Sequence, residues 1–201
     1  MVTAKDFTAV HTSVQDVILN DEPVIRVEKT EKIDIFDENT YALLNGSQFH
    51  NGIIEVKMLS RLLEDAPDFA RGFIGIVFRV NEKGSEFESF YVRPTNGNHP
   101  DPVRRSHGSQ YFSYPGYTFA YFREHAIEGY EAPADIALDQ WIRLKAVIRD
   151  ERAAFYVKDM EHPILEVSDL KHGKGIKGGV GFYVDTGTKA FFKDLKITCE
   201  D

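Results

Sequence analysis

Arginine and tyrosine side chains that could bind a polar ligand recur along residues 72–94, a stretch otherwise rich in aliphatic residues. Residues 73–80 and 87–92 are dense in β-branched and aromatic residues, and a polar turn separates them, so we predict two strands joined by a short loop. Alternation along these strands would place Arg79, Tyr91 and Arg93 on one face of a sheet. An arginine fork binds hydroxyls or a carboxylate, and a tyrosine offers a ring face and a hydroxyl. We therefore predict a ligand-binding patch on this face, with core residues on the opposite face: Ile74, Ile76, Phe78, Val80, Phe90 and Val92.

A second group of candidates lies in and after the long polar loop of residues 95–109. Long loops in compact domains often carry function. Residues 111–130 then contain five tyrosines and three phenylalanines. Sugars bind to aromatic ring faces flanked by a few aimed polar groups. The ligand-binding residues predicted from both groups are Arg79, Tyr91, Arg93, Gln110, Tyr111, Tyr114 and Arg123. The alternative is that these rings only pack beneath the long loops of the domain.

Catalytic and metal-binding residues leave a weaker pattern. Glu55 and His107 are the candidate acid or base groups, but no nucleophile elbow accompanies them. His99, Asp101 and His107 could meet on a metal only through the long loop, so we expect no metal centre and no cofactor. A calcium site stays open, because carbonyl and Asp ligands leave little trace in a sequence. Cys199, three residues from the C-terminus in sequence order, is expected to be an inert thiol.

The elements that would position these residues are almost all strands. Short runs of alternating apolar residues follow one another at close spacing, with turn signals between them, which indicates about twelve or thirteen strands. A helical turn fits best at residues 60–69. We predict one all-β domain over residues 1–201, a jelly-roll β-sandwich of two antiparallel sheets.

The charge balance limits the partners. Lys and Arg number 24 and Asp and Glu 32, a net charge of −8. An acidic chain is poorly suited to a phosphate backbone, so we expect no nucleic-acid partner. There is neither an apolar run long enough to span a membrane nor a secretory signal pattern, so we expect no membrane association and a cytoplasmic location.

Several strand and turn motifs follow one another in a fixed order: residues 49–56 (FHNGIIEV), 75–80 (GIVFRV), 90–94 (FYVRP), 140–145 (QWIRLK), 154–157 (AFYV), 178–182 (GGVGF) and 191–197 (FFKDLKI). In the order and spacing of these motifs the chain resembles the concanavalin A-like lectin/glucanase superfamily, and within it the laminin-G-like jelly rolls. It is also similar to the 3-keto-disaccharide hydrolase type domain. The resemblance implies two large antiparallel sheets, with sugars often bound on the concave face.

Glucanases of this superfamily carry acidic residues in a Glu-x-Asp-x-x-Glu pattern on one strand, which aims carboxylates into the cleft. The nearest match here is residues 32–37, where a lysine stands in place of the first glutamate. We therefore predict a carbohydrate-binding jelly roll that holds an oligosaccharide or a small sugar on its concave face. A glycoside hydrolase or polysaccharide lyase on the same fold is the alternative, and a protein-partner-binding module is a second one.

Overall fold

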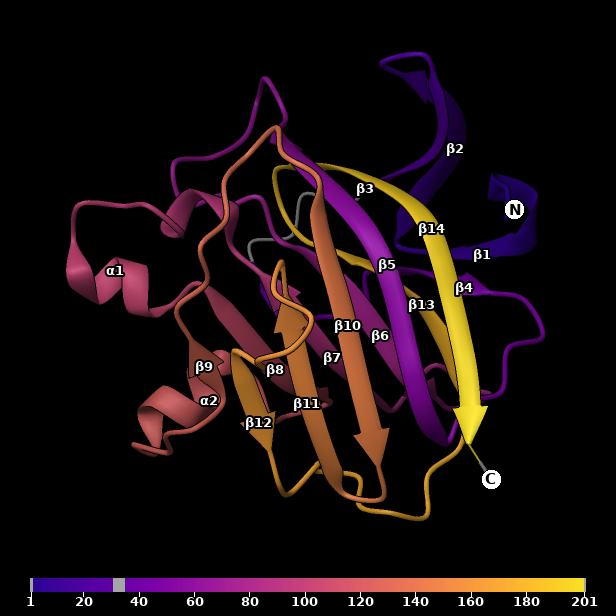
Figure 1. Cartoon of the computed structure of the whole chain (residues 1–201), viewed down its shortest axis with the longest axis vertical. Coiled ribbons are helices and arrows are strands. Elements are labelled where there is room, and N and C mark those ends of the chain that lie inside the picture. Colours follow the sequence, from indigo (N-terminus) through magenta and orange to yellow (C-terminus); the bar gives the residue numbers. More distant parts are fainter. Residues whose placement is uncertain (1, 31–34, 201) are drawn as a thin grey trace.

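The computed structural model describes residues 2–30 and 35–200, and within these ranges the chain forms two antiparallel sheets of seven strands each (Figure 1). Sheet one has the strand order β1 (Phe7–Val10), β4 (Tyr41–Leu44), β13 (Gly179–Val184), β6 (Ile74–Val80), β7 (Phe87–Val92), β8 (Ser109–Tyr114) and β9 (Glu131–Ala132). Sheet two has the order β12 (Leu165–Val167), β11 (Arg152–Val157), β10 (Ile142–Arg149), β5 (Asn51–Leu62), β14 (Thr188–Glu200), β3 (Glu22–Lys29) and β2 (Thr12–Leu19). This is the predicted jelly-roll β-sandwich.

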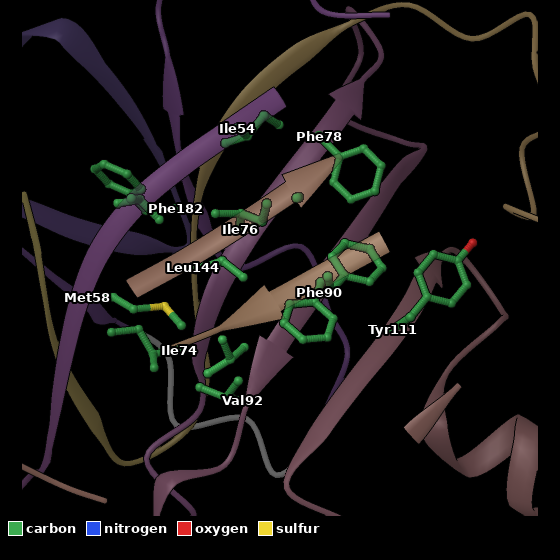
Figure 2. Close-up of a cluster of buried hydrophobic side chains, with 14 of the residues drawn as sticks. Ile54, Met58, Ile74, Ile76, Phe78, Phe90, Val92, Tyr111, Leu144 and Phe182 are labelled. Carbon is green, nitrogen blue, oxygen red and sulfur yellow. The ribbon is translucent and has the colours of Figure 1, made fainter. Parts of the chain in front are cut away.

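The core lies between the two sheets. Ile54, Met58 and Leu144 of sheet two meet aliphatic and aromatic side chains of sheet one (Figure 2). Phe90 on β7 stacks on Phe155 on β11 with ring centroids 4.2 Å apart. Each such side chain contributes about 1.5–3 kcal/mol when it leaves water. The predicted core positions Ile74, Ile76, Phe78, Phe90 and Val92 are confirmed.

A bulge at Arg79 changes the alternation at the end of β6. Arg79 has a φ of 54°, and the pairing of β6 with β13 shifts register between Gly179 and Gly181. One extra residue in a strand turns the following side chain to the other face. Val80 consequently packs in the cluster on the outer face of sheet one, so the prediction that it shares the core face with Ile76 was wrong.

The outer face of sheet one is also filled with apolar side chains. It carries a second cluster of buried residues, Tyr41, Phe73, Val77, Val80, Phe87, Tyr91, Phe112 and Tyr183. Residues 35–40 cover part of this face, because the Asp37 carboxylate accepts a hydrogen bond from the Tyr91 hydroxyl and its backbone N–H donates to Asp185. A sheet buried on both faces explains the near-continuous apolar run of β6. Of the segment 32–37, residues 32–34 lie outside the described ranges.

The short helices lie at one edge of the sandwich. α1 (Pro102–Ser106) and α2 (Phe119–Glu124) flank β9, and the two chain ends lie at the opposite edge (Figure 1). Asp101 accepts a hydrogen bond from Val103 N–H and Thr118 accepts one from Tyr121 N–H, which are N-cap interactions. Two 3-10 turns, Ala4–Asp6 (η1) and Pro94–Asn96 (η2), complete the described elements. No helix among the described residues has the length and apolar character of a membrane span.

The helix predicted at residues 60–69 was wrong. β5 continues to Leu62, and two turns follow it. Helices form instead inside the loop of residues 95–109 and inside the tyrosine-rich segment. Pro102 at the first helical turn and the capping side chains Asp101 and Thr118 favour those positions.

Candidate functional site

A pocket of about 310 Å³ opens beyond the end of β7, between α1, α2 and the covering segment 35–40. We call it the arginine pocket. Its walls combine four arginines with four phenylalanines, and they also carry one carboxylate and one histidine. The lining residues are Phe36, Phe69, Arg71, Phe73, Arg93, Asn96, Asp101, Val103, Arg104, His107, Phe119 and Arg123.

Arg93 forms the floor of the arginine pocket and is only 4% exposed. Its Nη1 donates to the His107 carbonyl at 3.1 Å and to Glu131 Oε1 at 3.0 Å. Its Nη2 donates to the Tyr91 hydroxyl at 3.0 Å and to Gln110 Oε1 at 3.2 Å. A guanidinium has four terminal N–H groups, so all of them are used inside the protein. Arg93 therefore supplies charge to the pocket and holds its floor together.

Glu131, on the edge strand β9, is the acid that binds Arg93. Arg123 of α2 also donates to both of its oxygens, at 2.6 and 3.2 Å, and His107 Nδ1 lies 3.0 Å from Oε2. Burial alone would raise the pKa of Glu131, but the hydrogen bonds from Arg123 and the charge of Arg93 outweigh it and lower this pKa. Glu131 is therefore an ionised carboxylate that neutralises part of the arginine charge.

Arg71 and Arg104 lie on the other side of the pocket without such an acid. Arg104 donates to Asn96 Oδ1 at 2.8 Å and to Thr95 Oγ1 at 3.1 Å, and its Nη1 lies 3.2 Å from His99 Nε2. Arg71 donates through Nη1 to the carbonyls of Asp68 and Ala70. Within the described residues, no carboxylate forms an ion pair with either arginine. Burial, and then the charges of Arg104 and Arg93, lower the pKa of Arg71.

Aromatic rings line the pocket beside these charges. Phe36 lies edge-on to Phe69 with ring centroids 5.4 Å apart, and 6.0 Å from Phe119. The guanidinium carbons of Arg93 and Arg123 lie 5.7 and 5.0 Å from the centre of the Phe119 ring. Phe69 is 38% exposed, so one ring offers free apolar surface.

A buried acid lies directly beneath the pocket. Asp37 is fully buried and accepts hydrogen bonds from the Tyr91 hydroxyl at 2.8 Å and from Phe119 N–H at 2.7 Å. Burial raises the pKa of Asp37 to about 7, and the charge of Asp185 adds to this effect. Asp185 itself pairs with Lys29 at 2.8 Å and accepts from the Tyr183 hydroxyl. The covering segment therefore rests on a network of buried polar groups.

Part of the predicted binding set meets at this pocket. Arg93, His107 and Arg123 line it, and Tyr91 and Gln110 lie beneath it as hydrogen-bond partners of Arg93. Arg93 and Tyr91 do project from the same face of sheet one, as predicted.

The other predicted residues lie elsewhere. Arg79 is fully buried at the end of β6 that lies away from the arginine pocket. The bulge there directs its guanidinium to the carbonyls of His50 and Gly173 and to the side chain of Asn51. The prediction that Arg79 stands beside Tyr91 and Arg93 was therefore wrong. Tyr111 lies on the core face, and its hydroxyl donates to buried Glu88 (Figure 2). Tyr114 stacks on Phe87 at 5.0 Å. Glu55 is on β5 of sheet two, 3.9 Å from Lys196, and does not contact Arg93.

Sequence reasoning missed Arg71, Arg104 and the phenylalanines of the pocket. Arg104 lies in the loop that was expected to be functional, so its loop position and charge were the available signal. Arg71, Phe36 and Phe69 lie in irregular segments where no periodicity indicates a direction.

His99, Asp101 and His107 each have a different partner in the loop. Asp101 caps α1, His99 contacts Arg104, and His107 contacts Glu131. Among the described residues, no group of three or more His, Cys, Asp or Glu side chains could hold a metal ion. The calcium site stays a prediction.

A larger hollow of about 680 Å³ lies between β3 and the part of β14 where its pairing with β5 shifts register between Lys193 and Lys196, but its charges are compensated. Lys57 pairs with Asp194, and Lys193 pairs with Glu22. A hollow of about 500 Å³ adjoins the arginine pocket and shares His107 and Arg123 with it. The arginine pocket combines the buried guanidinium of Arg93 with the exposed ring of Phe69.

Comparisons with known proteins identify the fold. No family model and no curated protein sequence matches the chain. The carbohydrate-binding module CBM66 from Bacillus subtilis is similar in structure, with a TM-score of 0.62 at 14% identity over 94% of this chain and 93% of that one.

Two further solved structures are also similar. A putative glycosyl hydrolase from Parabacteroides distasonis has a TM-score of 0.55 at 12% identity, over 99% of this chain and 90% of that one. A Bacillus subtilis protein of unknown function with a galectin-like fold has a TM-score of 0.53 at 16% identity, over 96% and 89%. The chain therefore has the jelly-roll β-sandwich fold of these structures.

Proposed function

We propose that this protein binds a carbohydrate and that the sugar occupies the arginine pocket. The observation that carries this proposal is the meeting of phenylalanine faces with guanidinium groups in one pocket of about 310 Å³. Apolar ring faces suit the C–H faces of a sugar, and a few fixed donors suit its hydroxyls. Its similarity in fold to a carbohydrate-binding module supports the proposal.

The pocket, rather than the middle of the outer face, is the proposed binding place. Tyr91 at the middle of that face is 1% exposed, whereas Phe69 and Arg123 at the pocket have exposed side chains. Glu131, the acid that binds two of the pocket arginines, also favours binding over hydrolysis. Glu131 is ionised and held by two arginines, which suits it poorly to donate a proton.

A glycan array followed by calorimetry on the ligands it identifies tests the proposal. Phe69→Ala is expected to weaken sugar binding about 10-fold through loss of one ring contact. Tyr117→Ala is the matched control, because Tyr117 is 36% exposed and lies outside the pocket. An assay for reducing and unsaturated ends on the same ligands is expected to show no turnover.

The outcomes separate the three functions. Equal weakening by both variants would move the site away from this pocket. New reducing or unsaturated ends would make the protein an enzyme on this fold. An array without any bound glycan, together with a specifically captured protein, would favour the partner-binding module.

A further inference from the structure

The arginine pocket carries more positive than negative charge. Four guanidinium groups line it, against the carboxylate of Asp101 in the wall, that of Glu131 beside it and the carboxyl group of Asp37 beneath it. Asp101 Oδ1 accepts from Val103 N–H, and Glu131 binds Arg93 and Arg123. Arg71 and Arg104 remain uncompensated in a chain whose overall charge is −8. Positive charge gathered in a hollow of an acidic protein attracts anions to that place.

The hydrogen bonds of Arg71 leave one side of its guanidinium open. Nη1 is held by the carbonyls of Asp68 and Ala70, whereas Nε and Nη2 make no hydrogen bond to any described residue. These two nitrogens form an edge that can bind both oxygens of an oxyanion at once.

Arg104 is held in place for the same task. Its Nε and Nη2 donate to Asn96 and Thr95, and His99 contacts Nη1, so the side chain is oriented before any ligand arrives. Orienting a side chain in advance lowers the entropic cost of binding. Nη1 and Nη2 each retain a second N–H that these contacts do not use.

Building on the proposed carbohydrate function, we propose that the sugar in the arginine pocket is acidic, and that its carboxylate or sulfate binds the Nε–Nη2 edge of Arg71 and pairs with Arg104. The exposed ring of Phe69 contacts the sugar ring itself. The bound anion relieves the repulsion among Arg71, Arg104 and Arg93. In the 680 Å³ hollow, by contrast, each lysine has a carboxylate partner, so it lacks this preference.

Calorimetry with three glycan probes tests the charge preference: an oligogalacturonate, a carrageenan oligosaccharide whose only anionic groups are sulfates, and a neutral galactan oligosaccharide of equal length. We expect one acidic probe to bind at least about 10-fold more tightly than the neutral one, the difference expected of one charge-assisted contact. The preferred acidic probe identifies carboxylate or sulfate as the anion. Raising the salt concentration is expected to weaken acidic binding and leave neutral binding unchanged. Acetate and inorganic sulfate, tested alone, are expected to bind far more weakly than the glycan.

Two variants locate the anion. Arg71→Gln and Arg104→Gln are each expected to weaken acidic binding about 10- to 100-fold. Arg71→Gln is also expected to change the Tm little, because the substitution removes a repelled charge together with the hydrogen bonds to the Asp68 and Ala70 carbonyls. Arg149→Gln is the control of equal charge change, since Arg149 on β10 is exposed and pairs with Glu200.

Each outcome decides between the two proposals. Equal affinity for the neutral probe, or full acidic binding in Arg71→Gln, would overturn the acidic preference and leave the carbohydrate function standing. Binding of acetate or sulfate as tightly as the glycans would remove the sugar from the proposal. Failure of every glycan, acidic or neutral, would refute both proposals.

Discussion

Arg93 is expected to stabilise the protein rather than bind the ligand directly, and Arg93→Met tests this. The substitution keeps most of the side-chain volume and removes all four terminal hydrogen bonds, to the His107 carbonyl, Glu131, Tyr91 and Gln110. The His107 carbonyl keeps a donor in Asn96, but Gln110 Oε1 loses its partner. Glu131 keeps Arg123.

The expected cost follows from these contacts. Removing one partner of a buried ion pair costs about 3–5 kcal/mol. Because Glu131 is 19% exposed and retains Arg123, we expect the lower end, about 3 kcal/mol in the free energy of unfolding. For a chain of this length this corresponds to a fall in Tm of about 6–12 °C.

Urea unfolding followed by the fluorescence of Trp141, the single tryptophan, measures this free energy. Arg123→Met is the matched control, because Arg123 pairs with the same Glu131 but is 45% exposed, and its loss should cost under about 1 kcal/mol. A double-mutant cycle with Glu131→Gln should give a coupling that is larger for Arg93 than for Arg123. If Arg93→Met stayed within about 1 kcal/mol of the unmodified protein while ligand binding vanished, the structural role would be refuted and Arg93 would be a ligand group.

Three further predictions concern two acidic side chains and the single thiol. The Asp37 carboxyl should titrate near pH 7 when followed by its ¹³C chemical shift, and titration near pH 4 would contradict its burial. Because the pKa of Asp37 is raised in the folded protein, its contribution to the free energy of unfolding is full below about pH 4 and declines as the pH rises to 7. Glu131 has a lowered pKa in the folded protein, so its contribution to the free energy of unfolding is full above its unfolded pKa of about 4.3 and is lost on further acidification. Glu131→Gln should therefore make the free energy of unfolding less dependent on pH in this acidic range. Cys199→Ser should leave Tm and ligand affinity unchanged, because the thiol is exposed, and a loss of binding would show a role for it.

Residue patterns alone were sufficient for the fold class and much of the core. Alternation of period two placed Ile74, Ile76, Phe90 and Val92 correctly, because side chains of a strand point to its two faces in turn. The same rule placed Tyr91 and Arg93 together, and their hydrogen bond confirms it. The rule failed at Arg79, where a left-handed backbone conformation inserts a bulge in a non-glycine residue.

The arginine pocket depended on tertiary structure. Its lining comes from four stretches: Phe36 in the covering segment, residues 69–73 before β6, residues 93–107, and Phe119 with Arg123 in α2. No periodicity relates these stretches, because the side chains of irregular segments point where long-range packing directs them. The acid that pairs with Arg93 shows the same limit, because only the pairing of β9 with β8 brings Glu131 beside Arg93. A charged side chain is compensated only if a partner from another segment lies close to it, so only the folded chain determines which charges stay uncompensated.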